Sequence, residues 1–138
     1  MKNDVQNEGF YEISHTADVA LGVIGPTLES LFLYAAKGFY SLVEIVADNR
    51  KKEHYEIDLL EINIESLLVS FLSELLFFLE KSVFMSEIEV TIHDNKLNAS
   101  LIGSPVISMQ HEIKAVTYND LEINFIDGMY ATTIVFDI

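Results

Sequence analysis

Cysteine is absent from the 138 residues of this chain. This absence excludes disulfides, thiolate zinc sites and cysteine nucleophiles together, and it agrees with a reducing cytoplasm. The start of the sequence lacks the apolar core of a signal peptide. The most apolar stretch, residues 67–79, contains Ser70, Ser73 and Glu74 and is shorter than the ~20 residues that span a membrane. We therefore expect a cytoplasmic protein without a membrane segment.

Basic residues are also scarce. Eight lysines and arginines face 22 aspartates and glutamates, which gives a formal charge of −14. Such a surface repels a phosphate backbone, so direct binding to nucleic acid is disfavoured, and a cation or a basic protein partner is favoured. Half of the residues are hydrophobic, which is typical of a packed globule. We expect one domain over residues 1–138.

Several catalytic signatures are missing. The sequence has no glycine-rich phosphate loop, no dinucleotide fingerprint, no nucleophile elbow and no zinc-ligand spacing. Ser14 and His15 are adjacent, and neighbouring residues on a strand point to opposite faces, so they do not form a nucleophile and base pair with each other. An autonomous nucleotide-binding enzyme and a serine hydrolase are both disfavoured.

Hydrophobic periodicity predicts an α+β fold. Apolar residues recur at helical spacing over residues 28–45 and, most regularly, over residues 67–79, where Asn63 can cap the second helix. Alternation with period two predicts the strands, and Gly103-Ser104-Pro105 is expected to interrupt them. The expected strands cover residues 10–23, 55–59, 88–92, 97–101, 113–118, 121–126 and 130–136. We predict a two-layer domain of order β-α-β-α followed by a run of strands, with two helices packed on one mixed, mainly antiparallel sheet.

Two acidic residues at opposite ends of the chain suggest a cation site. Asp18 points away from the apolar face of the first strand, and Asp137 precedes Ile138, where the sequence stops. If the first and last strands are neighbours in one sheet, both carboxylates and the terminal carboxylate meet. Oxygen ligands of this kind suit calcium, magnesium or manganese. The alternative is that Asp18 and Asp137 are unrelated surface acids.

His15 and Lys114 are candidate supporting residues. His15 either takes part in chemistry or bonds a backbone group in a local turn. Lys114 lies on a predicted strand, where it would neutralise part of the acidic cluster, orient a carboxylate or contact a partner. A surface ion pair worth about 0–1 kcal/mol is the simpler interpretation of this lysine.

These motifs occur in an order that resembles the archease family. The resemblance extends from about Phe10 to Ile138. It is carried by residues 15–18 (His-Thr-Ala-Asp), 25–29 (Gly-Pro-Thr-Leu-Glu), 67–68 and 74–76 in the second helix, 113–118 (Ile-Lys-Ala-Val-Thr-Tyr) and 137–138 (Asp-Ile).

The resemblance implies a non-enzymatic activator of an RtcB-type RNA ligase in tRNA splicing or RNA repair. It implies that the protein promotes guanylylation of the ligase and multiple turnover, and that it acts on the ligase rather than on RNA. It further implies a bound divalent cation, commonly calcium, with Asp18, Asp137 and Ile138 as ligands. Two positions depart from the family pattern, since Ser104 replaces a glutamate and Asn119 replaces a histidine.

Two other functions are compatible with the sequence. A metal-dependent hydrolase would use Asp18 and Asp137 to hold an ion that activates water, with His15 as a proton shuttle. A general chaperone or interaction module would use Phe77 and Phe78 as an adhesive surface. We expect these two phenylalanines in the core or at its margin instead.

Overall fold

The structure is a computed structural model that describes residues 7–14, 18–118 and 120–138. The described residues form nine strands and two helices. In chain order these are β1 (Gly9–Ser14), β2 (Asp18–Gly25), α1 (Leu28–Val43), β3 (Ile45–Ala47), β4 (Glu53–Leu60), α2 (Ile64–Glu80), β5 (Val83–His93), β6 (Lys96–Met109), β7 (Ala115–Thr117), β8 (Asn124–Ile126) and β9 (Met129–Asp137).

The strands form two antiparallel sheets. In the first sheet the order is β1-β2-β9-β7, and β8 also pairs with β9. In the second sheet β6 pairs with β5 along one edge and with β4 and β3 along the other. The last strand of the chain is therefore a central strand of the first sheet.

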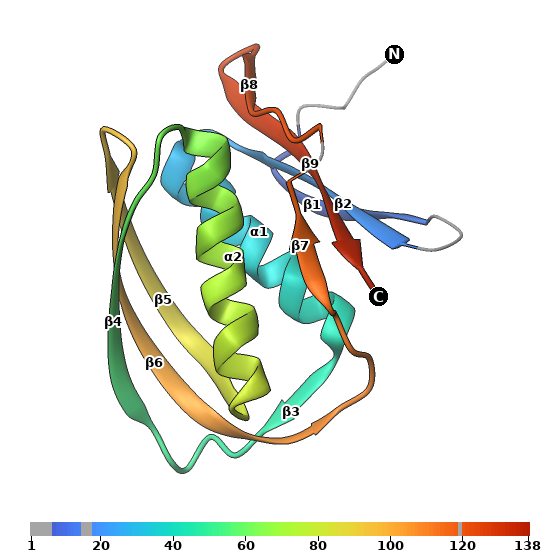
Figure 1. Cartoon of the computed structure of the whole chain (residues 1–138), viewed down its shortest axis with the longest axis vertical. Coiled ribbons are helices and arrows are strands. Elements are labelled where there is room, and N and C mark those ends of the chain that lie inside the picture. Colours follow the sequence, from blue (N-terminus) through green and yellow to red (C-terminus); the bar gives the residue numbers. More distant parts are fainter. Residues whose placement is uncertain (1–6, 15–17, 119) are drawn as a thin grey trace.

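Both helices contact strands of both sheets, and Figure 1 shows them lying between the two sheets. The predicted α+β class, with two helices packed on antiparallel strands, is confirmed. The expected single sheet is wrong, because the strands divide into two sheets that enclose the helices. Alternation along a strand indicates which residues are buried, but it carries no information on which strand is the neighbour.

Local sequence explains where the helices begin and end. Thr27 caps α1: its hydroxyl accepts a hydrogen bond from the Ser30 N–H (3.0 Å), and the Ser30 hydroxyl accepts one from the Thr27 N–H (3.0 Å). Asn63 caps α2 by accepting from the Ser66 N–H (2.8 Å). Glu44 ends α1 in the left-handed conformation (φ 57°), and the chain turns directly into β3.

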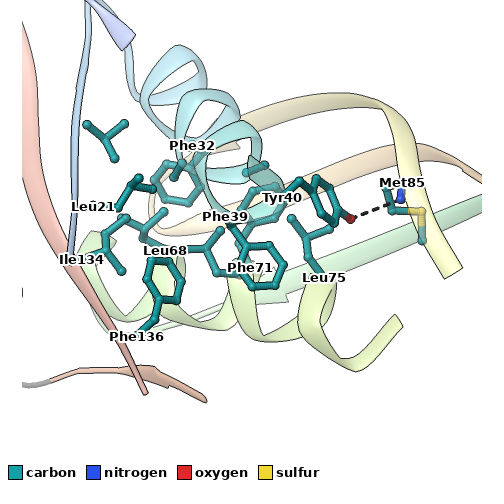
Figure 2. Close-up of a cluster of buried hydrophobic side chains, with 14 of the residues drawn as sticks. Leu21, Phe32, Phe39, Tyr40, Leu68, Phe71, Leu75, Met85, Ile134 and Phe136 are labelled. Atoms are coloured by element: carbon teal, nitrogen blue, oxygen red, sulfur yellow. Dashed lines mark hydrogen bonds between the residues drawn. The ribbon is translucent and has the colours of Figure 1, made fainter. Parts of the chain in front are cut away.

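One hydrophobic cluster joins the two sheets through the helices. Figure 2 shows Phe32 and Phe39 of α1 beside Phe71 of α2, with Phe136 of β9 close to them. The ring of Phe32 lies 5.7 Å from that of Phe71, and Phe39 is stacked on Phe136 at 5.7 Å. All four rings are fully buried. The core thus fixes β9 against the helices from one side.

Tyr40 supplies a polar contact inside this core. Its hydroxyl accepts a hydrogen bond from the Met85 N–H (3.2 Å), next to an irregularity in the β5–β6 pairing (Figure 2). Burial raises the pKa of the Tyr40 phenol, although the Met85 hydrogen bond lowers it by a smaller amount. The phenol therefore stays protonated at neutral pH.

We expect Tyr40→Phe to destabilise the fold by about 1–3 kcal/mol, because it leaves the buried Met85 N–H without an acceptor. Urea unfolding followed by circular dichroism measures this loss. Tyr34→Phe is the matched control, since the Tyr34 hydroxyl donates to the exposed Glu8 carboxylate and its loss should matter less. Equal effects of the two substitutions would contradict the role given to Tyr40.

Three predicted boundaries need correction. The strand expected over residues 10–23 is two antiparallel strands, β1 and β2, and residues 15–17 between them lie outside the described residues. The helix expected over residues 28–45 ends at Val43. Strand β6 continues through Pro105 to Met109. The proline is tolerated because the pairing of β4 with β6 ends at Gly103.

Candidate metal centre

The pairing of β2 with β9 brings the two predicted carboxylates together. Asp18 and Asp137 are direct partners in the antiparallel register. The side chains of such partners lie on the same face of a sheet, with Cβ atoms about 4.5–5.5 Å apart. The predicted convergence of the first and last parts of the chain is therefore confirmed.

The two aspartates lie on the face of the sheet away from the helices. Val19 and Leu21 of β2, and Ile134 and Phe136 of β9, belong to the buried core. Residues that alternate with them along each strand point to the other face. Asp137 is exposed and Asp18 is half-buried there, so a hydrated ion can reach both.

These aspartates line an open pocket of about 450 Å³. We call it the acidic pocket, and its lining residues are Asp18, Thr117, Asp120, Thr133, Val135 and Asp137. Thr117 comes from β7, where it pairs with Val135 of β9. The Thr117 hydroxyl oxygen is buried and has no hydrogen-bond partner within the described residues. The pocket therefore offers a neutral oxygen beside its carboxylates.

Hydrogen bonds to the start of α2 hold the segment that carries Thr117 and Asp120. The Tyr118 hydroxyl bonds the Ser66 hydroxyl (2.7 Å) and also donates to Asn63 Oδ1 (3.2 Å). Asp120 follows with a positive φ of 58°. The capping residue of α2 thus also helps to position one wall of the acidic pocket.

The residues of the acidic pocket fit a hard divalent cation. Like charges placed directly opposite on two strands repel each other, and a cation between Asp18 and Asp137 would remove that repulsion. Carboxylate and hydroxyl oxygens are the ligand types that calcium and magnesium prefer. Within the described residues, no three aspartate, glutamate, histidine or cysteine side chains form a ligand cluster. Two carboxylates would therefore need main-chain oxygens and water to complete the coordination.

The resemblance implies that Ile138 contributes a backbone or terminal oxygen rather than its side chain. That side chain is half-exposed and lines a different pocket, together with Val19 and Ile113. This arrangement follows from alternation, because Asp137 and Ile138 point to opposite faces of the sheet. The role of Ile138 as a ligand remains a prediction.

The two predicted supporting residues have different outcomes. His15 lies outside the described residues. Lys114 is exposed, and its N–H donates to the Asp137 carbonyl oxygen (2.7 Å), so its backbone lies beside the acidic pair. Lys114 makes no ion pair with any residue that the structure describes. Its predicted role in supporting the site stays open.

Comparison with known proteins identifies the family. Residues 10–138 match the model of the Archease protein family (MTH1598/TM1083). The chain belongs to the archease family. Protein archease from Thermococcus kodakarensis is 35% identical over 134 residues, which cover 90% of this chain and 94% of that protein. Protein archease from Methanosarcina mazei is 32% identical over 143 residues, with coverage of 96% and 98%.

Solved archease structures share the fold. The crystal structure of an archease and possible chaperone from Thermotoga maritima has a TM-score of 0.73 at 24% identity, and the match covers 91% of this chain and 94% of that one. The solution structure of Methanobacterium thermoautotrophicum protein 1598 has a TM-score of 0.69 at 24% identity, with coverage of 94% and 99%. The arrangement of two helices on antiparallel sheets is therefore that of an archease.

Sequence reasoning did not find Thr117 and Asp120 as residues of the acidic pocket. Neither residue forms part of a local motif that indicates an ion site. One signal was available, because Thr117 and Ala115 share a face of β7 and Ala115 pairs with Asp137. Using it requires knowing that β7 is the neighbour of β9.

Neither helix in the described parts of the chain is long and apolar enough to cross a membrane.

Proposed function

We propose that this archease is a cytoplasmic, non-enzymatic protein that binds a divalent cation and activates an RtcB-type RNA ligase. In this proposal it promotes guanylylation of the ligase and sustains multiple turnover in tRNA splicing or RNA repair. Membership of the archease family supports an activator or chaperone-like role. The ligase, the cation and the guanylylation step are the parts that we propose.

The observation that carries the proposal is the register pairing of Asp18 with Asp137. Residues almost a whole chain apart place two carboxylates opposite each other on an accessible face. A neutral pair at this position would stabilise the sheet more than two facing carboxylates do. We infer that the pair holds a cation.

Asp18, Asp137 and a main-chain oxygen of Ile138 would hold the cation, with calcium as the first candidate and magnesium or manganese as alternatives. The bound ion would supply positive charge that fixes the ends of β2 and β9 side by side. Thr117 would orient water or bind the ion through its unpartnered hydroxyl. Lys114 would support the site from the neighbouring backbone. We propose His15 as a second supporting residue.

The charge of the chain supports a protein partner rather than RNA. A formal charge of −14 favours rapid association with a basic surface, such as one beside the active site of an RNA-binding enzyme. The same charge disfavours direct contact with an RNA backbone. We therefore expect the archease to act on the ligase and not on its substrate.

A ligase assay tests this function. With the ligase limiting and substrate in excess, added archease should convert a reaction of about one turnover into many turnovers and raise the fraction of guanylylated ligase. The readouts are ligated RNA and label incorporated from GTP. Unchanged guanylylation over many turnovers would contradict the proposal. Suppressed aggregation of unrelated proteins without any effect on the ligase would instead favour a general chaperone. Phe77, whose side chain is 48% exposed, would then be part of the surface that binds those proteins.

A further inference from the structure

A second pocket contains a cluster of lysines. Its lining residues are far in the sequence from Asp18 and Asp137. It has a volume of about 480 Å³, and its polar lining includes Lys51, Lys52, Glu53, Lys81 and Ser104. Three of the eight basic residues of the chain are therefore in one place. We call this the lysine pocket.

Three separate segments build the lysine pocket. Lys51 and Lys52 come from the loop before β4, Lys81 caps the end of α2, and Ser104 lies on β6. Hydrogen bonds join these segments: the Asp48 N–H donates to the Pro105 carbonyl (2.8 Å), and the Val106 N–H donates to the Ser82 carbonyl (2.9 Å). The lysines are thus carried on segments whose backbones are fixed to the sheet.

Few acidic groups neutralise these lysines. Lys52 Nζ lies 3.8 Å from Glu87 Oε2, at the long limit of an ion pair, and both side chains are more than half exposed. Lys81 Nζ lies over the Phe77 ring, 5.0 Å from its centroid. Lys51 makes no ion pair with a described residue, and the nearby Asp48 carboxylate, on which its charge also acts, is paired with Arg50 (3.0 Å). The Glu53 carboxylate in the pocket wall accepts a hydrogen bond from the Tyr55 hydroxyl (2.7 Å).

Ser104 provides an independent indication of a ligand. The residue is only 1% exposed, it lines the lysine pocket, and its hydroxyl has no hydrogen-bond partner within the described residues. A buried hydroxyl without a partner costs free energy, so most such groups in proteins are satisfied. A ligand with oxygen acceptors would satisfy this donor.

We propose that the lysine pocket binds the phosphate group of a small molecule. Three ammonium groups face the Glu53 carboxylate of the pocket wall and the more distant Glu87 carboxylate beside Lys52, so the pocket keeps a net positive charge. That charge attracts a phosphate monoester, which carries about −1.5 to −2 at pH 7. Lysine is a common phosphate ligand because its ammonium group is a compact point charge with three donors. Tyr55, Val83 and Pro105 in the same wall offer apolar surface to the organic part of an ester.

The net charge of the chain favours a small ligand over a nucleic acid. Long-range repulsion from a charge of −14 grows with the charge of the approaching molecule, whereas contacts inside the pocket depend only on the group that enters it. A volume of about 480 Å³ also lies within the usual range of ~300–1,000 Å³ for small-molecule sites.

Titration calorimetry with inorganic phosphate and with phenyl phosphate tests this proposal. We expect both to bind, and tighter binding of phenyl phosphate would identify an ester as the preferred form. Lys51→Gln and Lys81→Gln should each weaken binding about tenfold. Lys96→Gln is the matched control, because Lys96 is exposed in the β5–β6 hairpin and outside the pocket, and it should leave binding unchanged.

Ser104→Ala separates ligand binding from folding. Because the hydroxyl has no partner in the described fold, its removal should leave the melting temperature equal or higher while phosphate binding weakens several-fold. Absence of phosphate binding at millimolar concentrations would overturn the proposal. Equal weakening by Lys96→Gln, or tighter binding of a single-stranded RNA than of either phosphate probe, would also overturn it.

Discussion

Replacing Asp18 and Asp137 together with asparagine is expected to lower the affinity for calcium by about a hundredfold or more, because both charged ligands of the proposed site are lost. Calorimetry with CaCl₂ at low ionic strength measures this change. Each single substitution should weaken binding less than the double substitution does. The same variants should lose their stimulation of the ligase in proportion to the lost affinity.

The sign of the effect on stability gives a second test of the acidic pair. Without added metal, Asp18→Asn should stabilise the fold by about 0.2–1 kcal/mol, because it removes repulsion between facing carboxylates. With excess calcium it should be less stable than the parent protein, because the parent gains stability from binding. Asp94→Asn is the control, since Asp94 lies exposed beside His93 in the distant β5–β6 turn. A parent protein that calcium neither binds nor stabilises would contradict the metal site.

Truncating the centre of the core should have the largest effect on stability. Phe71→Ala is expected to lower the free energy of unfolding by about 3–5 kcal/mol, because Phe71 is fully buried and its ring contacts Phe32 of the other helix. That loss is a large part of the ~5–15 kcal/mol by which domains are usually stable. Guanidinium unfolding of the parent and the variant measures it.

Phe77→Ala is a control on the same helix. Phe77 is 48% exposed and contacts Phe78 and Lys81 at the surface, so its truncation should cost far less. Similar losses for Phe71→Ala and Phe77→Ala would contradict the packing that places only one of these rings at the centre. The exposure of Phe77 also corrects the expectation that it lies in the core or at its margin, whereas Phe78 does pack there against Tyr55.

Periodicity predicted the parts of the fold that depend on neighbouring residues in sequence. Helix α2 was expected after an Asn63 cap with its apolar stripe reaching Leu79, and it spans Ile64–Glu80, because its apolar residues recur at three- and four-residue steps. The division of the strands into two sheets was not predictable in this way. It depends on partners far apart in the chain, such as β2 with β9, and a single strand contains no record of its partner.

The candidate site was partly predictable for the same reason. Asp18 and Asp137 stood out because they flank the ends of the sequence, and the register confirms that they meet. Thr117 and Asp120 reach the same pocket from a third strand and the loop after it, so sequence spacing did not reveal them. The lysine pocket was missed because Lys51, Lys52 and Lys81 lie on different segments, and no local motif links them.

The central place of β9 has a consequence for biosynthesis. On the ribosome, β1, β2 and α1 emerge early, but the strand that joins β2 to β7 and β8 is made only after almost all of this sequence has been translated. Until then the nascent chain exposes an unpaired edge of β2 and part of the apolar surface of α1. The pairing of β2 with β9 is slow to form, because the two strands are far apart in the sequence. The newly made polypeptide therefore presents a strand edge that is open to pairing with other chains until the last strand is made.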